Sequence, residues 1–398
     1  MKLFVVLIPI WLFANLFPPT LDWEYKTLLQ FAAFVWLPII ACFVAHGQFL
    51  VGPLFRIRPS MFAWTTTSVF AITLSALLCV DPLRSMGYVA TAAVGLITCA
   101  GLWQLIGRKL PQALSIYTVA GTLFNIYLYF EGPRVQERLT ITDQTPANYL
   151  GLLSFGFLMC SFAIGRWWLS TALIVANFVI IIATQSRSGL IASIVGAVIY
   201  LILRQIQIHK ARTVFVVGGI LLLSLGLLLM FQDLVENSVS SLLFLDNKYR
   251  GLGTGFTGRL GAWHEAADLF LSNPWFGVGF RMHESYMTTL SSAHNGYLSL
   301  FAEVGIVGAL PLLTLVFLAC WNLLRQSMAG DSMAALSLSF VLGYLFVAAF
   351  ERYFLNMGNP TSILAWLFLL YPGQRSLPLW HQQPQNAFGY PSRLAQVG

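Results

Sequence analysis

Long apolar runs separated by short polar segments extend along almost the whole chain. A run of roughly 18 or more apolar residues with few charges is long enough to cross a membrane as a helix. The runs lie at 3–17, 27–46, 61–80, 87–106, 112–130, 147–164, 168–184, 189–203, 213–231, 296–324, 334–350 and 360–372. The pattern predicts an all-α integral membrane protein of about 12 transmembrane helices, with residues 1–398 forming a single polytopic domain.

The composition also indicates a membrane protein, and it limits the classes of partner that the protein can have. Hydrophobic residues make up 58% of the chain and charged residues only 9%, whereas a soluble domain carries roughly 25% charged residues. The net charge is +7, but no basic stretch alternates with aromatic residues as in a protein that binds single-stranded nucleic acid. We therefore expect the lipid bilayer, and no nucleic acid, as a partner.

The distribution of Lys and Arg predicts which side of the membrane each segment faces. Short cytoplasmic segments are richer in Lys and Arg than short outer segments, and this bias is satisfied when the amino terminus is cytoplasmic. With alternating spans, the carboxyl-terminal tail 373–398 is then also cytoplasmic. Two longer segments, 131–146 and 232–295, fall on the outer side.

Residues 259–272, inside the long outer segment, have the spacing of a short amphipathic helix. The apolar positions recur every three or four residues, and they are Leu260, Trp263, Ala267, Phe270 and Leu271. Pro274 and Gly277 end the pattern. A helix of this kind lies along the membrane surface, with Trp263 at the interface.

The stretch GLGTGFTGR, residues 251–259, places glycines at the spacing of a dinucleotide-binding loop. That motif needs a preceding buried strand within a βαβ unit, and neither is indicated here. Glycines also let backbone N–H groups approach an anion closely, and Arg259 adds a guanidinium that suits phosphate. Gly255, Gly258 and Arg250 are therefore candidate substrate-binding residues beside Arg259. The alternative is a flexible outer loop with a solvated Arg259.

A second arginine, Arg187, lies in TQSRSG, residues 184–189, between two predicted spans. It is the only charge in that turn, and its polar neighbours would let it point into a polar outer cavity. The alternative is an arginine at a helix end that reaches towards the interface.

His294 and Asn295 directly precede the predicted span 296–324. The amino end of a helix disfavours an imidazolium, so a neutral His294 would be competent as a general base near pH 7. Glu303 follows in the same span and would orient a polar site. The alternatives are a histidine that caps or anchors the helix and a structural acid that faces a cavity.

The evidence for further catalytic or metal-binding residues is weaker. His264 and His283 show no pattern that separates them from solvated surface histidines. The sequence has no H-E-x-x-H motif and no cluster of His and carboxylates at ligand spacing, so we expect no metal site and no cofactor.

These segments together resemble the O-antigen ligase and bacterial polysaccharide polymerase superfamily. The resemblance rests on TQSRSG, on TGFTGRLGAW and NPWFGVGF in the long outer segment, and on AHNGYLSLFAEVGIVG. DQTPANYLG, residues 143–151, is similar to the family's Asp-Pro-Asn segment, although Ala147 separates Pro146 from Asn148. Glu351 resembles a recurrent acid of the family. The resemblance extends over residues 140–370.

The resemblance implies a GT-C-like membrane glycosyltransferase on the periplasmic face of the bacterial inner membrane, with no metal. Its donor would be a glycan linked to undecaprenyl diphosphate. Its acceptor would be a sugar hydroxyl, on lipid A core for a ligase or on another repeat unit for a polymerase, and polysaccharide assembly proteins would be further partners. Arg187 and Arg259 match the arginines that face the donor diphosphate, and His294 matches the histidine that activates the acceptor. Candidate substrate-binding residues also include Asn295, Trp263, Glu303 and Asn148.

A secondary transporter or flippase is the main alternative function. Such proteins carry ionisable residues or broken helices near the bilayer midplane, whereas the spans here hold almost no charges apart from Glu303. A scaffold for polysaccharide assembly is a third candidate. The sequence leaves ligase and polymerase unseparated.

Overall fold

The computed structural model describes residues 12, 59–142, 146–209, 259–290, 292–352 and 354–373. The α-helices in these ranges are α5 (Pro59–Leu77), α6 (Pro82–Ile106), α7 (Leu110–Glu131), α8 (Ala147–Ser161), α9 (Trp167–Thr184), α10 (Arg187–His209), α13 (Arg259–Ser272), α14 (Gly296–Met328), α15 (Ser332–Ala348) and α16 (Pro360–Leu369). Two 3₁₀ turns, η3 (Gly107–Lys109) and η5 (His283–Tyr286), and two short strands, β1 (Arg134–Val135) and β2 (Arg138–Leu139), complete this part of the chain.

The helices are those of a multi-pass membrane protein. Within the described ranges, five are long and apolar enough to cross a membrane, namely α6, α7, α9, α10 and α14. The shorter apolar helices α5, α8, α15 and α16 accompany them. The all-α membrane class is therefore confirmed. The count of twelve stays a prediction, because 27–46, 213–231 and all of 3–17 except residue 12 lie outside the described residues. Gly255, Gly258, Arg250 and nearly all of the tail 373–398 also lie outside them.

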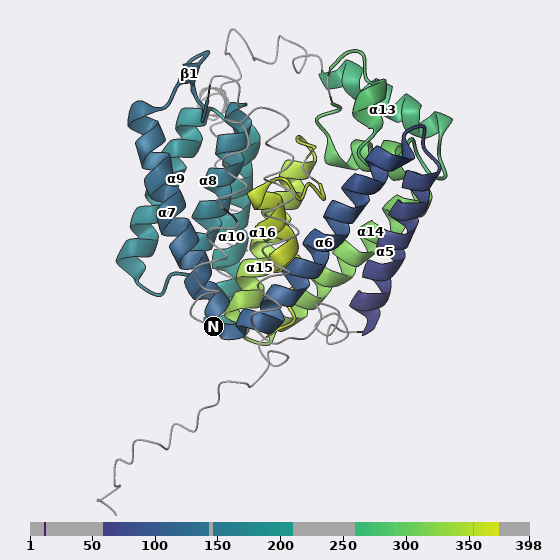
Figure 1. Ribbon diagram of the computed structural model, residues 1–398. Helices are drawn as coiled ribbons and strands as arrows, with labels where there is room; N and C mark the ends of the chain where they lie inside the picture. The colour runs from purple at the N-terminus through teal and green to yellow at the C-terminus, as the bar shows by residue number, and fades with distance from the viewer. Residues whose placement is uncertain are drawn as a thin grey trace, which may run out of the picture.

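The short helices α8, α15 and α16 are the most buried of the bundle. Every residue of α16 is buried, and α8 is buried over nearly its whole length, as expected for helices that are hydrophobic on all sides. By contrast α9 exposes large apolar residues such as Trp167 and Val175. Figure 1 shows α15 and α16 between a group formed by α7, α8, α9 and α10 and a group formed by α5, α6 and α14.

The outer loops that the sequence predicts contain regular structure at one end of the bundle. The segment 131–146 contains an antiparallel pairing of β1 with β2, which the hydrophobic pattern did not indicate. Both β1 and α13 lie at this end in Figure 1. Helix α13 spans the residues that the sequence predicts, but its buried face consists of Ala262 and Ala266, while Leu260 and Leu271 are exposed. The small alanines let α13 pack closely on α14. This close packing decides which face of α13 is buried, so the larger apolar residues Leu260 and Leu271 stay exposed.

Helix α14 is interrupted at Gly305, where the backbone leaves the helical region (φ 59°, ψ −166°). The segment that follows α13 fills the gap and satisfies the exposed backbone groups. The N–H groups of Val278 and Gly279 donate to the carbonyls of Ala302 and Glu303, each at 2.9 Å. The N–H groups beyond the break donate back, from Ile306 to Pro274 and from Val307 to Trp275. The break therefore joins the outer segment firmly to a membrane helix.

Candidate functional site

The candidate residues converge because most of them lie at helix ends on the same side of the bundle. Arg187 and Arg259 are the first residues of α10 and α13, and His294 directly precedes the N-cap of α14. Asn148 lies in the first turn of α8, and Glu351 follows the end of α15. Antiparallel neighbours bring these ends together, although the residues lie far apart in the chain.

Glu351 is the centre of this group. Its side chain is 5% exposed, and Oε1 lies 3.5 Å from Nη2 of Arg259 while Oε2 lies 3.6 Å from Nδ1 of His294. Asn148 donates an amide hydrogen bond to Oε1 at 2.6 Å. On its far side, Asn148 accepts a hydrogen bond from Nη2 of Arg138 at 2.6 Å. A buried carboxylate thus connects an arginine, a histidine and a polar chain that leads to β2.

Arg187 reaches this group because glycines let α8 and α10 approach closely. A Cβ atom on Gly189 would lie 3.0 Å from the backbone carbonyl of Gly151, which is too close for any larger side chain to fit without a shift. Gln185 ends α9 in the left-handed conformation (φ 50°) and turns the chain at once into α10. The partly exposed guanidinium of Arg187 experiences the positive charge of Arg259. The two arginines therefore face a common space.

His294 and Asn295 have different roles at the start of α14. Asn295 is the N-cap, and its Oδ1 accepts hydrogen bonds from the N–H groups of Tyr297 and Leu298, each at 3.0 Å. Its predicted contact with substrate is untested, but its carbonyl oxygen is already used by the helix. The side chain of His294 is 35% exposed, and its backbone is left-handed (φ 48°). Asn295 therefore fixes the helix end, and His294 is the residue presented to the site.

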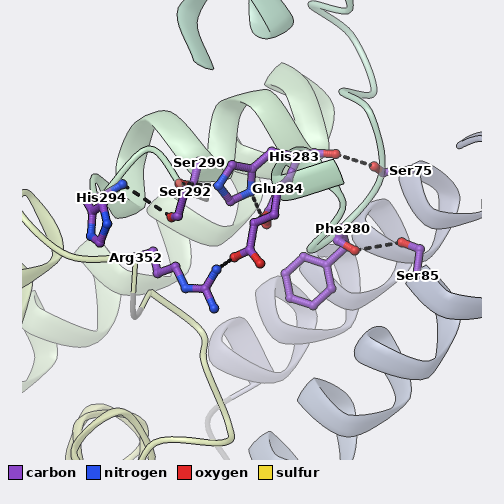
Figure 2. Close-up of polar contacts among 10 residues, drawn as sticks. Ser75, Ser85, Phe280, His283, Glu284, Ser292, His294, Ser299 and Arg352 are labelled. Carbon is purple, nitrogen blue, oxygen red and sulfur yellow. Dashed lines mark hydrogen bonds and ion pairs between the residues drawn. The ribbon is translucent and has the colours of Figure 1, made fainter. Parts of the chain in front are cut away.

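Glu303 and His283 differ from what the sequence predicts. His283 is 1% exposed, so the interpretation as a solvated surface histidine is wrong. Its Nδ1 lies 2.5 Å from Oε1 of Glu303, and its Nε2 lies 3.2 Å from Oγ of Ser299. Glu303 therefore pairs with His283 and not with His294. Figure 2 shows the two histidines on either side of Arg352, which pairs with Glu284.

Two residues of the site escaped the analysis of motifs. Glu351 was noted only through resemblance, and Arg138 not at all, because neither belongs to a motif with a recognisable local spacing. They are linked through Asn148, a contact between distant parts of the chain, and their burial makes such a partner necessary. Trp263, on the first turns of α13, is half-buried. Its predicted contact with substrate is untested.

The electrostatics of the site favour an anion. Arg187 and Arg259 occupy first residues of helices, where the helix dipole disfavours a cation and favours an anion. Arg259 lies 3.5 Å from the carboxylate of Glu351, and Arg138 is linked to that carboxylate through Asn148. Among the described residues, no group of three or more His, Cys, Asp or Glu side chains is arranged to hold a metal ion. The guanidinium groups of Arg187 and Arg259 are suited to bind phosphate oxygens.

Comparison with known proteins agrees with this geometry. Residues 172–313 match the family model described as O-antigen ligase, a range that contains Arg187, Arg259 and His294. No curated protein matches the chain. The match supports an assignment to the O-antigen ligase family over these residues.

Proposed function

We propose that this protein is an inverting, metal-independent glycosyltransferase on the periplasmic face of the bacterial inner membrane. It takes a glycan from undecaprenyl diphosphate and transfers it to a sugar hydroxyl, as an O-antigen ligase or as a polysaccharide polymerase. The observation that carries the proposal is the convergence of Arg259 and His294 on the buried Glu351, with Arg187 close enough to Arg259 to feel its charge.

The proposed reaction is a single displacement at the anomeric carbon. The acceptor oxygen attacks this carbon as the bond to the diphosphate oxygen breaks, which inverts the configuration. The acceptor proton passes to Nε2 of His294, acting as a general base. The diphosphate leaves with its negative charge, which Arg187 and Arg259 stabilise as it develops.

The break in α14 is the observation that favours the alternative of a transporter or flippase. Interrupted helices with nearby ionisable residues line ion and substrate sites in transporters. Here, however, the backbone groups at the break are bonded to residues 274–279, and Glu303 is 4% exposed beside His283. These groups are already satisfied, so the break supports an architectural role and not a transport site.

The test replaces the arginines in the purified enzyme. Arg259→Lys and Arg187→Lys keep the charge but lose the planar fork that binds two phosphate oxygens. We expect transfer to fall about 100-fold or more with unchanged protein yield, whereas Arg134→Lys on β1 should leave transfer near normal. Transfer is measured in detergent with EDTA, from a defined undecaprenyl-diphosphate glycan to lipid A core or to a second repeat unit.

The outcomes separate the candidate functions. The acceptor that is used distinguishes ligase from polymerase. Near-normal transfer by both lysine variants would disprove the diphosphate contact. Absence of transfer in detergent, together with movement of the lipid-linked glycan across liposomes, would favour a flippase. Loss of transfer on addition of EDTA would reveal a metal requirement.

A further inference from the structure

A chain of three hydrogen-bonded side chains leads from β2 to the candidate base. Arg138 donates from Nε to the carbonyl of Thr184 at 2.8 Å and from Nη2 to Oδ1 of Asn148 at 2.6 Å. Asn148 donates from Nδ2 to Oε1 of Glu351 at 2.6 Å. Oε2 of Glu351, the other oxygen, faces Nδ1 of His294. Thr184 ends α9, so the chain is anchored on the backbone of a membrane helix.

The chemistry of the two ends fixes the orientation of Asn148. A guanidinium can only donate hydrogen bonds, and an ionised carboxylate can only accept them. The amide oxygen of Asn148 must therefore face Arg138 and its NH₂ group must face Glu351. Arg138 is 5% exposed and Glu351 is 4% exposed, and buried charges are costly unless they are paired and hydrogen-bonded. Asn148 satisfies both charges while keeping them apart.

This orientation has a consequence for His294. Because Glu351 is held as an acceptor, the proton on the imidazole is drawn to Nδ1, which leaves the Nε2 lone pair as the base. The distance of 3.6 Å between Nδ1 and Oε2 is longer than a hydrogen bond, and Nδ1 has no other partner in the described part of the chain. Catalytic hydrogen bonds are often long in the absence of substrate and shorten in the complex.

We propose that Arg138 and Asn148 are positioning residues that hold Glu351 as a hydrogen-bond acceptor and thereby set the tautomer of His294. This inference rests on the proposed function, in which His294 takes the acceptor proton. Within the described ranges, the other charged groups of this region are Arg259 on α13, Arg187 beside it and the Arg352–Glu284 ion pair. Arg259, 3.5 Å from Oε1, can also only donate, so it favours the same acceptor state of Glu351 as Asn148 does.

The proposal makes a specific prediction for amide and acid exchanges. In Glu351→Gln, Asn148 still donates, so the new amide turns its oxygen to Asn148 and its NH₂ group to His294. His294 then takes the wrong tautomer. In Asn148→Asp, two carboxylates face each other and one must become protonated. The double variant Asn148→Asp/Glu351→Gln restores the sequence of donors and acceptors, because the new aspartate accepts hydrogen bonds from Arg138 and from the glutamine NH₂ group. The glutamine oxygen then faces His294 again.

The experiment compares kcat per folded enzyme, the KM for the donor and the pH profile of transfer. Each single variant should lose about 10- to 100-fold in kcat with little change in KM, and the double variant should recover at least part of that loss. Asn148→Ala, which adds no charge, should also lower kcat and covers the case in which a single variant fails to fold.

The matched control is Asn125→Ala. Asn125 binds Ser154 and Asn177 in a separate buried network, so this change should affect stability and leave kcat unchanged.

The outcomes distinguish a failure of this inference from a failure of the proposed function. If His294→Ala is inactive while Asn148→Ala keeps the kcat and pH profile of the wild type, the positioning role is wrong and the base assignment stands. A double variant that is no more active than the less active of the two single variants would also overturn the positioning role of Asn148. If His294→Ala keeps its transfer activity, the base assignment and this inference both fail, whereas the proposed function fails only if the wild-type enzyme transfers no glycan.

Discussion

Two His–Glu pairs lie close together in this protein, and they differ in almost every physical respect. In the first, Nδ1 of His294 is 3.6 Å from Glu351, and the histidine side chain is 35% exposed. In the second, Nδ1 of His283 is 2.5 Å from Glu303, and the histidine side chain is 1% exposed. Arginines flank the first pair, whereas Ser299 completes the second. Within the part of the chain that the structure describes, Nε2 of His294 makes no hydrogen bond, whereas both ring nitrogens of His283 have partners.

The sealed pair shows that connectivity alone does not define an active site. Ser299, His283 and Glu303 are linked in the order of a nucleophile, a base and an orienting acid. All three are at most 5% exposed, so no substrate reaches the serine. Ser75 donates to the carbonyls of Phe276 and Glu303, and Ser85 donates to the carbonyl of Phe280, as Figure 2 shows in part. The pair belongs to the contacts that hold the segment after α13 against α14.

The largest expected effect separates the two pairs directly. His294→Ala removes the base of the open pair, and loss of a general base costs about 100- to 10,000-fold in rate. We expect this loss in kcat, with normal protein yield and retained binding of the lipid-linked donor. The measurement is transfer by the purified enzyme in detergent, together with donor binding. An active His294→Ala enzyme would remove the base assignment.

The matched variant is His283→Ala in the sealed pair. Breaking a buried, hydrogen-bonded pair costs about 3–5 kcal/mol of stability, because Glu303 is left without its partner. Protein yield and thermal stability should fall, while the enzyme that does fold keeps its kcat within a few-fold. If His283→Ala folds normally and is inactive, the comparison between an open and a sealed pair is wrong.

The sequence predicted one member of each pair, His294 and Glu303, but not the way they pair. Glu303 lies in the span that His294 precedes, so the sequence suggested that the two act at one site, whereas Glu351 is distant in the chain. The break at Gly305 and the inserted segment 274–279 bring His283 to Glu303 instead. Helix bounds depend on local apolar spacing, which is why α13 ends at the predicted residue, Ser272. Partner choice depends on long-range packing, which no local pattern contains.

The next expected effect concerns the glycine that allows the break. A Cβ atom on Gly305 would lie 2.4 Å from the carbonyl of Trp275. The backbone of Gly305 (φ 59°, ψ −166°) lies in a region that other residues rarely adopt, which costs alanine about 1–3 kcal/mol, and overpacking costs about 1–3 kcal/mol more. Gly305→Ala should therefore lower thermal stability and displace the segment that carries His283. Gly101→Ala in α6, where a Cβ atom meets nothing within 4 Å, is the control and should be neutral. Equal stability of the two variants would contradict the role given to the break.

The smallest expected effect is at Glu265 on α13, outside both pairs. Hydrogen bonds from Thr288, and next from Thr289, lower the pKa of Glu265 to about 2 from an ordinary value of 4.5. Because the pKa is lowered in the folded state, the stabilisation is complete above pH 4.5 and is lost as the pH falls towards 2. The difference in melting temperature between the wild type and Glu265→Gln should therefore be constant from about pH 7 to pH 5 and shrink at about pH 4 and pH 3.

Asp268→Asn, at an exposed position on the same helix, is the control, and transfer at neutral pH should hardly change in either variant. A difference that stays constant down to about pH 3 would show that Thr288 and Thr289 do not hold this carboxylate in its charged form.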